Sequence, residues 1–314
     1  MTYATSDFSS ELSSLPRLPG WSTVRSAQTA EQIAFLSGAG LCVLDALVRH
    51  DSGRVPTRLL ANRLALRCAA ATSKLEGRFA RESDIRDAFR FASSDAERGP
   101  DGDVLAFWRR VARLRPTFSA DIDKCVGDPF ADTVGTWLSE AAQRTQSHGP
   151  ASACLDIMAK VLQADDRAER FACLLSDIVL ARAMGWDQPL PLTALHLTKT
   201  DLRDLNAGSE RGVGQGIIRA IQTAVHLCHQ LMRHAAALRA LAPKLRARGA
   251  KDAVGLFLSE DAVAPSTMLS PCIQGTNVAM TDRAARRLCD RLVDLGVARE
   301  LTGRATFRLY GLLE

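Results

Sequence analysis

The sequence is poor in the residues that build β-sheets. Aromatic side chains make up only 5% of its 314 residues, and few segments are rich in valine, isoleucine or threonine. Strands favour β-branched and aromatic residues, so a fold built mainly from strands is excluded. Alanine, leucine and arginine dominate instead, which predicts a mainly α-helical protein. The length allows two domains, or one large domain and a small one.

Closely spaced cysteine pairs are also missing. The chain has eight cysteines, and none of them forms a C-x-x-C pair. Most lie inside apolar helical patterns, which is typical of buried free cysteines. The thiols are therefore expected to be small core residues of a protein that works in a reducing compartment.

Membrane and export signals are weak. The start "MTYATSDFSSELSS" has neither the basic stretch nor the apolar core of a signal peptide. The most apolar run, Ile33 to Val48, contains Asp45 and is shorter than the ~20 residues of a membrane span. We expect a cytoplasmic protein without a membrane partner. Its formal charge of +5 and pI of about 8.9 permit binding to nucleic acid without demonstrating it.

Recognisable catalytic and cofactor motifs are absent. His226 and His229 are three residues apart on one helical pattern, with His234 beyond them, but no third metal ligand follows at a matching spacing. The run "DLRDLNAGSERGVGQG" contains G-x-G-x-G, yet it lacks the G-K-[ST] and the preceding strand of a phosphate loop, so a flexible loop is expected there. No serine–histidine–acid set emerges. We expect no catalytic residues, no metal and no cofactor, and hence no enzyme.

Helical periodicity organises most of the chain. Residues 1–22 are rich in serine and proline and predict a flexible N-terminal arm that docks at Trp21. Residues 23–243 predict a multi-helix bundle, the helical body, and "APKLRARGAK" (Pro243 to Lys251) predicts a domain boundary. Helices are expected over 29–48, 57–77, from 83 onward, across "DVLAFWRRVARLR", and over 130–145, 151–162, 168–184 and 213–241.

Residues 251–314 carry a different pattern. "DAVGLFLSED" predicts a helix, and "PSTMLSPCIQG" predicts a second, irregular helix and turn. Thr281 is placed to cap a third helix, whose apolar stripe includes Leu288 and Leu292, and Gly296 is placed to end it. "VAREL" and "TFRLYGL" then alternate like strands around the turn "TGRA". Three helices followed by a small β-hairpin predict a C-terminal winged helix-turn-helix.

This C-terminal region is rich in arginine. From Thr281 to Arg308 there are seven arginines against four acids, a net charge of +3. Arginine suits both guanine edges and phosphates, so the third helix is expected in the major groove and the wing on the backbone or minor groove. The expected DNA-contacting residues are Thr281, Arg283, Arg286, Arg287, Arg304 and Arg308.

Several segments resemble a known bacterial family. "FLSGAGLCVLDALV", "SKLEGRFARESDIRDAFRF", "GPDGDVLAFWRRVARL" and "LLSDIVLARAMGWDQPLPL" are similar to successive parts of the family catalogued as domain of unknown function 1403. The ending "MTDRAARRLCDRLVDLGVARELTGRATFRLYGL" is also similar to the winged-helix tails of Fic-type proteins. The resemblance implies a helical body with a C-terminal winged helix. It implies no activity, because the histidine-led Fic motif is missing.

Three functions remain open at this point, of which an enzyme with its site in the helical body is the least expected. The first is a DNA-binding protein, a regulator of transcription that reads double-stranded DNA with its winged helix. Its helical body would take a partner protein or effector and support a homodimer. The alternative is a helical scaffold for protein–protein interaction, in which the winged domain is a docking surface and its arginines form a solvated face.

Overall fold

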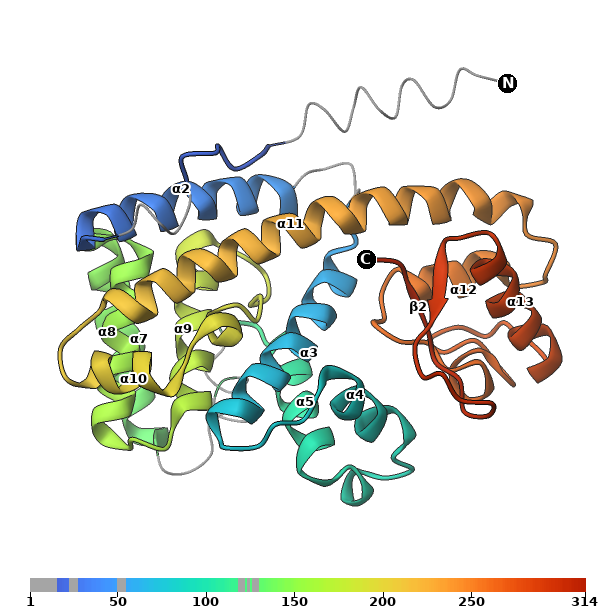
Figure 1. Ribbon diagram of the computed structural model, residues 1–314, viewed down its shortest axis with the longest axis horizontal. Helices are drawn as coiled ribbons and strands as arrows, with labels where there is room; N and C mark the ends of the chain where they lie inside the picture. Colours follow the sequence, from blue (N-terminus) through green and yellow to red (C-terminus); the bar gives the residue numbers. More distant parts are fainter. Residues whose placement is uncertain (1–15, 23–27, 50–54, 118–121, 123–124, 126–129) are drawn as a thin grey trace.

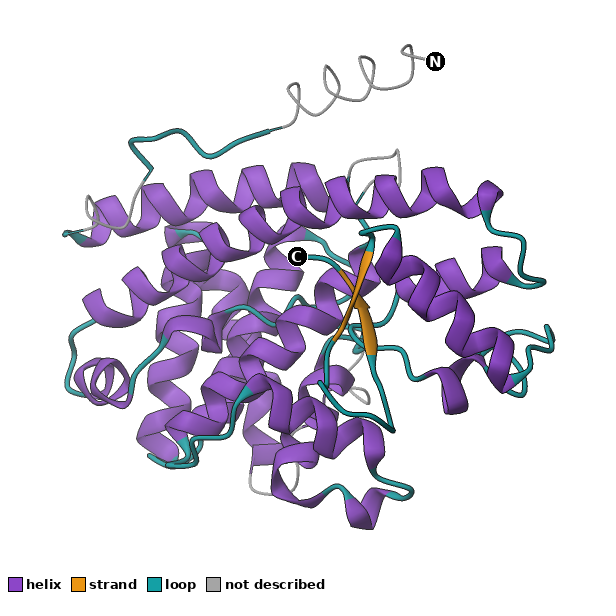
Figure 2. Cartoon of the chain, turned by 45° about the vertical axis from the view of Figure 1, so that its right-hand side comes forward, coloured by secondary structure: helices purple, strands orange, loops and turns teal. Residues whose placement is uncertain are grey.

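The computed structural model describes residues 16–22, 28–49, 55–117, 122, 125 and 130–314, and these are mostly helical (Figure 2). The predicted mainly α fold is therefore confirmed. The expected flexible arm lies largely outside the described residues. The helices of the body are α2 (Ala30–Val48), α3 (Thr57–Leu75), α4 (Glu82–Phe91), α5 (Gly99–Val111), α7 (Ala131–His148), α8 (Pro150–Ala164), α9 (Glu169–Met184), α10 (Lys199–Asn206) and α11 (Arg211–Leu241), with 3-10 turns at Asp95–Glu97 (η2), Thr193–His196 (η4) and Ala242–Lys244 (η5).

The longest helix, α11, joins the two parts of the molecule. Its 31 residues span about 46 Å at 1.5 Å per residue. Figure 1 shows α2 lying along one half of α11, with α7 to α10 packed beneath that half. The other half of α11 extends over the residues that follow it, 250–314, which we call the C-terminal module.

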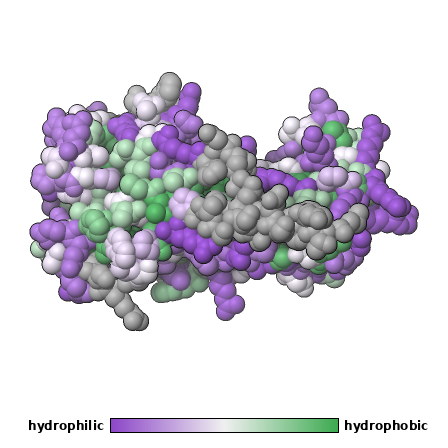
Figure 3. Space-filling view, turned by 90° about the horizontal axis from the view of Figure 1, so that it is seen from above, coloured by the Kyte–Doolittle hydropathy of each residue, from purple (hydrophilic) through white to green (hydrophobic). Residues whose placement is uncertain are grey.

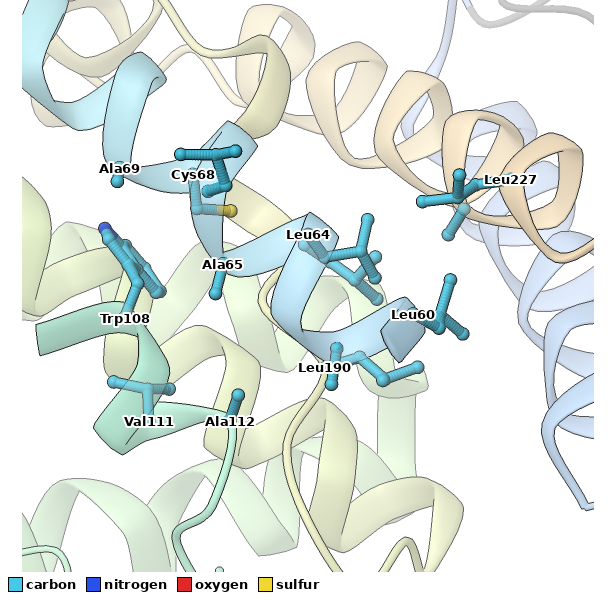
Figure 4. Close-up of a cluster of buried hydrophobic side chains, with 14 of the residues drawn as sticks. Leu60, Leu64, Ala65, Cys68, Ala69, Trp108, Val111, Ala112, Leu190 and Leu227 are labelled. Carbon is cyan, nitrogen blue, oxygen red and sulfur yellow. The ribbon is translucent and has the colours of Figure 1, made fainter. Parts of the chain in front are cut away.

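The core of the body is centred on α3, which is buried on most of its circumference. Leu60 and Leu64 of α3 point toward Leu227 of α11, and the opposite side of α3, at Ala65 and Ala69, lies toward Trp108 of α5 (Figure 4). The Trp108 indole N–H donates to the hydroxyl of Thr72 at 3.0 Å, so the one polar atom of this large ring is satisfied. Five of the eight cysteines are buried and all eight are free thiols, in keeping with the expected role of core residues.

Glycines allow α2 and α11 to pack closely. A Cβ on Gly40 of α2 would lie 2.8 Å from Cγ2 of Ile221, and one on Gly214 of α11 would lie 2.7 Å from Cγ2 of Ile33. Gly214 belongs to the G-x-G-x-G run that was expected to be a flexible loop. That expectation is wrong, because the run forms the first turns of α11. The missing side chains of its glycines leave room for side chains of neighbouring elements to pack against the helix.

This close approach predicts opposite effects for two glycines of the same helix. Gly40→Ala is expected to be destabilising, because the added methyl group meets Ile221, whose β-branched side chain has little rotamer freedom in a helix. Gly38→Ala is the matched control: its Cβ would meet nothing within 4 Å, so only the higher helix propensity of alanine acts. In urea unfolding we expect the two variants to differ by about 1–3 kcal/mol, with Gly38→Ala the more stable. Equal stabilities would contradict the close packing.

Helix α2 is long and apolar enough, by length and composition alone, to cross a membrane. Its inner face packs on α11, and its outer face exposes Phe35, which stacks on Trp21 with ring centroids 5.7 Å apart. Figure 3, the view onto this side, shows an apolar area bordered by hydrophilic residues. Core helices of soluble proteins also pass this test, so the feature is weak evidence for a membrane span.

The C-terminal module consists of helix α12 (Ala250–Phe257), a π-helical turn η6 (Pro265–Leu269), helix α13 (Asp282–Asp294) and strands β1 (Ala298–Glu300) and β2 (Tyr310–Leu312). The strands pair antiparallel, with Arg299 opposite Gly311, and Val263 forms a bridge to Tyr310. The predicted order of elements is present. The second strand is shorter than predicted, however: the nine residues between β1 and β2 form a long connection, in which Phe307 has a φ of 57°.

The module is joined to the body by arginines. From α3, Asn62 donates to the carbonyl of Ser259 at 2.7 Å, and Arg63 donates to the carbonyl of Leu312. From α4, Arg86 donates to the carbonyl of Leu301 at 3.0 Å. Apolar residues of both parts belong to one continuous core. The C-terminal module and the body are therefore joined both by hydrogen bonds and by a shared hydrophobic core.

Candidate nucleic-acid interface

Helix α13 begins and ends where the sequence predicts. The Thr281 hydroxyl accepts the backbone N–H of Ala284 at 3.3 Å, which caps the helix, and Gly296 follows it with a φ of 66°. Ala285, Leu288 and Leu292 are buried against the module. The charged face of α13 is therefore turned to solvent by the packing of the apolar stripe.

Three arginines share that exposed face. Arg283, Arg287 and Arg291 are spaced four residues apart, so they form one row along the helix. None of them makes an ion pair with another described residue, which leaves three guanidinium groups available to a ligand. Arg287 and Arg283 were expected here from sequence. Arg291 was counted in the basic excess but was not assigned to the site.

A shallow groove accompanies this row. It has a volume of about 450 Å³ and lies between α13 and the segment that follows α11, where Leu245, Arg246 and Ala247 form its other wall. Arg246 is exposed and faces the same groove, so it adds a fourth cation. The basic run "KLRAR" was expected only at a domain boundary. The clustering of its charges was the available signal that it belongs to a surface with α13.

Arg286, also expected at the interface, is placed differently from the row. Its guanidinium lies 2.9 Å from the carboxylate of Asp282, one turn earlier in α13. Both side chains are exposed, and such a pair contributes only a few tenths of a kcal/mol. Arg286 can exchange this partner for a phosphate at small cost.

The two wing arginines are placed differently: Arg304 lies against the helical body, whereas Arg308 contacts residues of the C-terminal module. Arg304 pairs with Asp87 of α4 at 3.2 Å and its guanidinium lies 5.3 Å from the ring centroid of Phe91. Arg308 donates to the carbonyl of Arg304 at 3.1 Å. Phe307 meets Phe91 edge-on at 6.2 Å. Arg304 therefore lies away from the row formed by Arg283, Arg287 and Arg291. Arg308, by contrast, lies beside α13, with its guanidinium 4.0 Å from the carboxylate of Asp290.

The histidines that were weighed as metal ligands lie on α11. Within the described parts of the chain, no group of three or more histidine, cysteine, aspartate or glutamate side chains is arranged to hold a metal ion. Burial lowers the pKa of His229, and its Nε2 is buried without a described hydrogen-bond partner.

Comparison with protein families gives a match over nearly the whole chain. A family model described as "Protein of unknown function (DUF1403)" matches residues 6–312. A search of curated proteins finds no match. The match covers the helical body and the C-terminal module together, so the two parts form one recurrent unit.

Proposed function

The chain belongs to the DUF1403 family of proteins of unknown function, and we propose that it binds double-stranded DNA through its C-terminal module. In this proposal the module is a winged helix-turn-helix, with α13 as the helix that enters the major groove and the β1–β2 connection as the wing. The protein acts as a regulator of transcription in the cytoplasm. The helical body takes a protein partner or effector, and a homodimer would set the spacing of two half-sites.

The observation that carries the proposal is the arginine row of α13. Arg283, Arg287 and Arg291 lie on one exposed face, with Arg246 across the groove, and no described acid pairs with them. Cations that are already exposed and unpaired can contact phosphates and base edges without breaking a native ion pair. Thr281 and Arg286 flank the row at the start of the same helix. Arg304 would join the interface if it exchanged Asp87 for a phosphate, and Arg308 if it exchanged Asp290.

We expect Arg283→Ala/Arg287→Ala to weaken binding to genomic duplex DNA by at least about 30-fold, because each lost contact costs about 1–3 kcal/mol. The slope of log affinity against log salt should also fall by nearly 2 units, since two phosphate contacts are removed. Fluorescence anisotropy with a labelled duplex, repeated at several salt concentrations, measures both quantities.

The matched control is Arg167→Ala/Arg203→Ala, which removes two exposed arginines of the body and changes the net charge equally. It should retain most of the affinity. If both double variants bind equally well while keeping the helical circular-dichroism signal, the α13 interface is refuted. Salt-insensitive binding to a protein, without DNA binding, would instead favour the scaffold function.

A further inference from the structure

A second cationic site lies away from α13, in a cleft at the junction between the body and the C-terminal module. The cleft has a volume of about 520 Å³, within the usual range of small-molecule sites. Phe89, Leu114 and Ala106 contribute apolar surface, and Gln274 contributes an amide from the module. Its charged lining residues are Arg90, Arg98, Arg109, Arg110, Arg113 and a single acid, Glu260.

Nearby acids neutralise only part of this charge. Arg90 and Arg109 share Glu260 and Asp261, and Arg98 pairs with Asp95 at 2.5 Å. Arg110 has no ion pair with any described residue. Among the described acids, Arg113 has an ionic contact with Glu260 at 3.9 Å, which is beyond hydrogen-bond distance. Within the described part of the chain, the cleft therefore holds one guanidinium group without an ion pair, that of Arg110, and one with only a long contact to an acid, that of Arg113.

Neighbouring arginines also repel Arg113. Burial lowers the pKa of Arg113, and the charges of Arg109, Arg58 and Arg90 lower it further. In addition, Nε of Arg90, whose side chain is only 9% exposed, is buried and has no described hydrogen-bond partner. A bound anion would relieve the repulsion and supply acceptors that the cleft itself lacks.

We propose that this cleft binds a small ligand that carries several phosphate charges. Arg110 and Arg113 lie three residues apart, so their guanidinium groups project from the same side of the helix end and can both reach one oxyanion. Arginine presents a planar fork of donors that fits phosphate oxygens in pairs. The hollow accommodates a small polyanion, whereas the row of α13, exposed along its shallow groove, suits a duplex.

The ligand would touch both parts of the protein. Arg110 and Arg113 come from the body, whereas Glu260 and Gln274 come from the C-terminal module. A phosphate bound at Arg113 would lie beside Glu260 and repel it, because both are negatively charged. This repulsion would weaken the ion pairs of Glu260 with Arg90 and Arg109. Ligand binding in the cleft is thus coupled to the packing of the C-terminal module against the helical body. The binding itself does not rest on the proposed function.

The test is titration calorimetry of the full chain with inorganic tripolyphosphate, with citrate in a parallel arm at matched ionic strength. We expect saturable one-to-one binding of tripolyphosphate, at least 10-fold tighter than citrate. Arg110→Gln/Arg113→Gln should lose at least 10-fold in tripolyphosphate affinity, whereas Arg167→Ala/Arg203→Ala should bind like the wild type. Both arginines are exposed, so the variant is expected to keep its circular-dichroism spectrum and melting temperature in buffer.

Three results would overturn the proposal. One is unchanged tripolyphosphate affinity in the folded Arg110→Gln/Arg113→Gln variant. Another is equal affinity for citrate, which would remove the preference for phosphate. The third is displacement of tripolyphosphate by a short duplex in the Arg283→Ala/Arg287→Ala variant, which would make the cleft a nucleic-acid surface. Because the α13 variant keeps the cleft intact, failure of DNA binding and failure of polyanion binding are distinguishable.

Discussion

Replacing Arg109 with methionine is expected to lower the free energy of unfolding by about 3–5 kcal/mol. Arg109 and Arg90 form a buried quartet with Glu260 and Asp261, which joins α4 and α5 to the loop after α12. The distances are 2.6 Å from Arg109 to Asp261 and 2.7 Å from Arg90 to Glu260. All four side chains are at most 9% exposed, so removal of one cation leaves carboxylate charge buried without compensation.

The expected loss is measured by urea unfolding at neutral pH. The control is a variant in which all four members are replaced by apolar residues of similar volume. It should lie much closer to the wild type, because it removes the desolvation cost of the charges together with their attraction. A loss below about 1 kcal/mol in Arg109→Met would show that the quartet is not held together in solution.

The quartet also has a defined pH dependence. Burial by itself raises the pKa of Asp261, but the charges and hydrogen bonds of Arg90 and Arg109 outweigh burial and lower that pKa to about 2. A carboxyl group whose pKa is lowered on folding stabilises the protein above its unfolded pKa of about 3.9. That contribution is lost as the pH falls toward 2, so the junction between body and module is expected to weaken in acid.

Asp177→Asn is expected to remove a pH dependence of the opposite sign. Asp177 is buried in α9 and accepts the backbone N–H groups of Leu192 and Thr193 at 3.1 and 3.0 Å. Burial raises its pKa from 3.8 to about 7, although these hydrogen bonds act in the other direction. The folded protein therefore holds a proton that the unfolded chain releases, and stability falls as the pH rises from about 4 to about 7.

A shift from 3.8 to about 7 corresponds to a loss on the order of 4 kcal/mol across that range. Asparagine keeps an acceptor for the two N–H groups but cannot ionise, so the variant should be the more stable protein near pH 8. Urea unfolding between pH 5 and 8 measures the two slopes, and exposed Asp204→Asn is the matched control. Parallel slopes for wild type and Asp177→Asn would refute a buried, protonated carboxyl group.

Local patterns were sufficient to predict most helices and their ends. The eight expected helices of the body are present within a few residues of their predicted limits, because amphipathic spacing and caps act over one or two turns. Thr281 caps α13 and Gly296 follows it as predicted. The short helix α10 was missed, since its eight residues precede a glycine-rich run that resembles a loop.

Features that depend on distant partners could not be predicted. Arg90 and Arg109 meet acids more than 150 residues away, and nothing local distinguishes them from solvated arginines. Distant partners also explain why the second strand of the wing is shorter than predicted. Alternation from Thr306 onward predicted a strand, but the connection folds onto α4, where Phe307 and Arg304 find partners. Arg246 and Arg291 likewise belong to one groove only because the fold brings two segments together.

Several arginines hold the structure together through main-chain oxygens. Arg63 donates to the carbonyl of Leu312, Arg86 to that of Leu301, and Arg49 to that of Gly185 at 2.7 Å. A carbonyl is present whatever residue occupies the acceptor position, so these contacts do not depend on the acceptor's side chain, whereas lysine cannot reproduce the donor fork. In aligned relatives, the two positions of each such contact should therefore show little covariation. Residue contacts inferred from covariation are then expected to omit these arginine–carbonyl pairs.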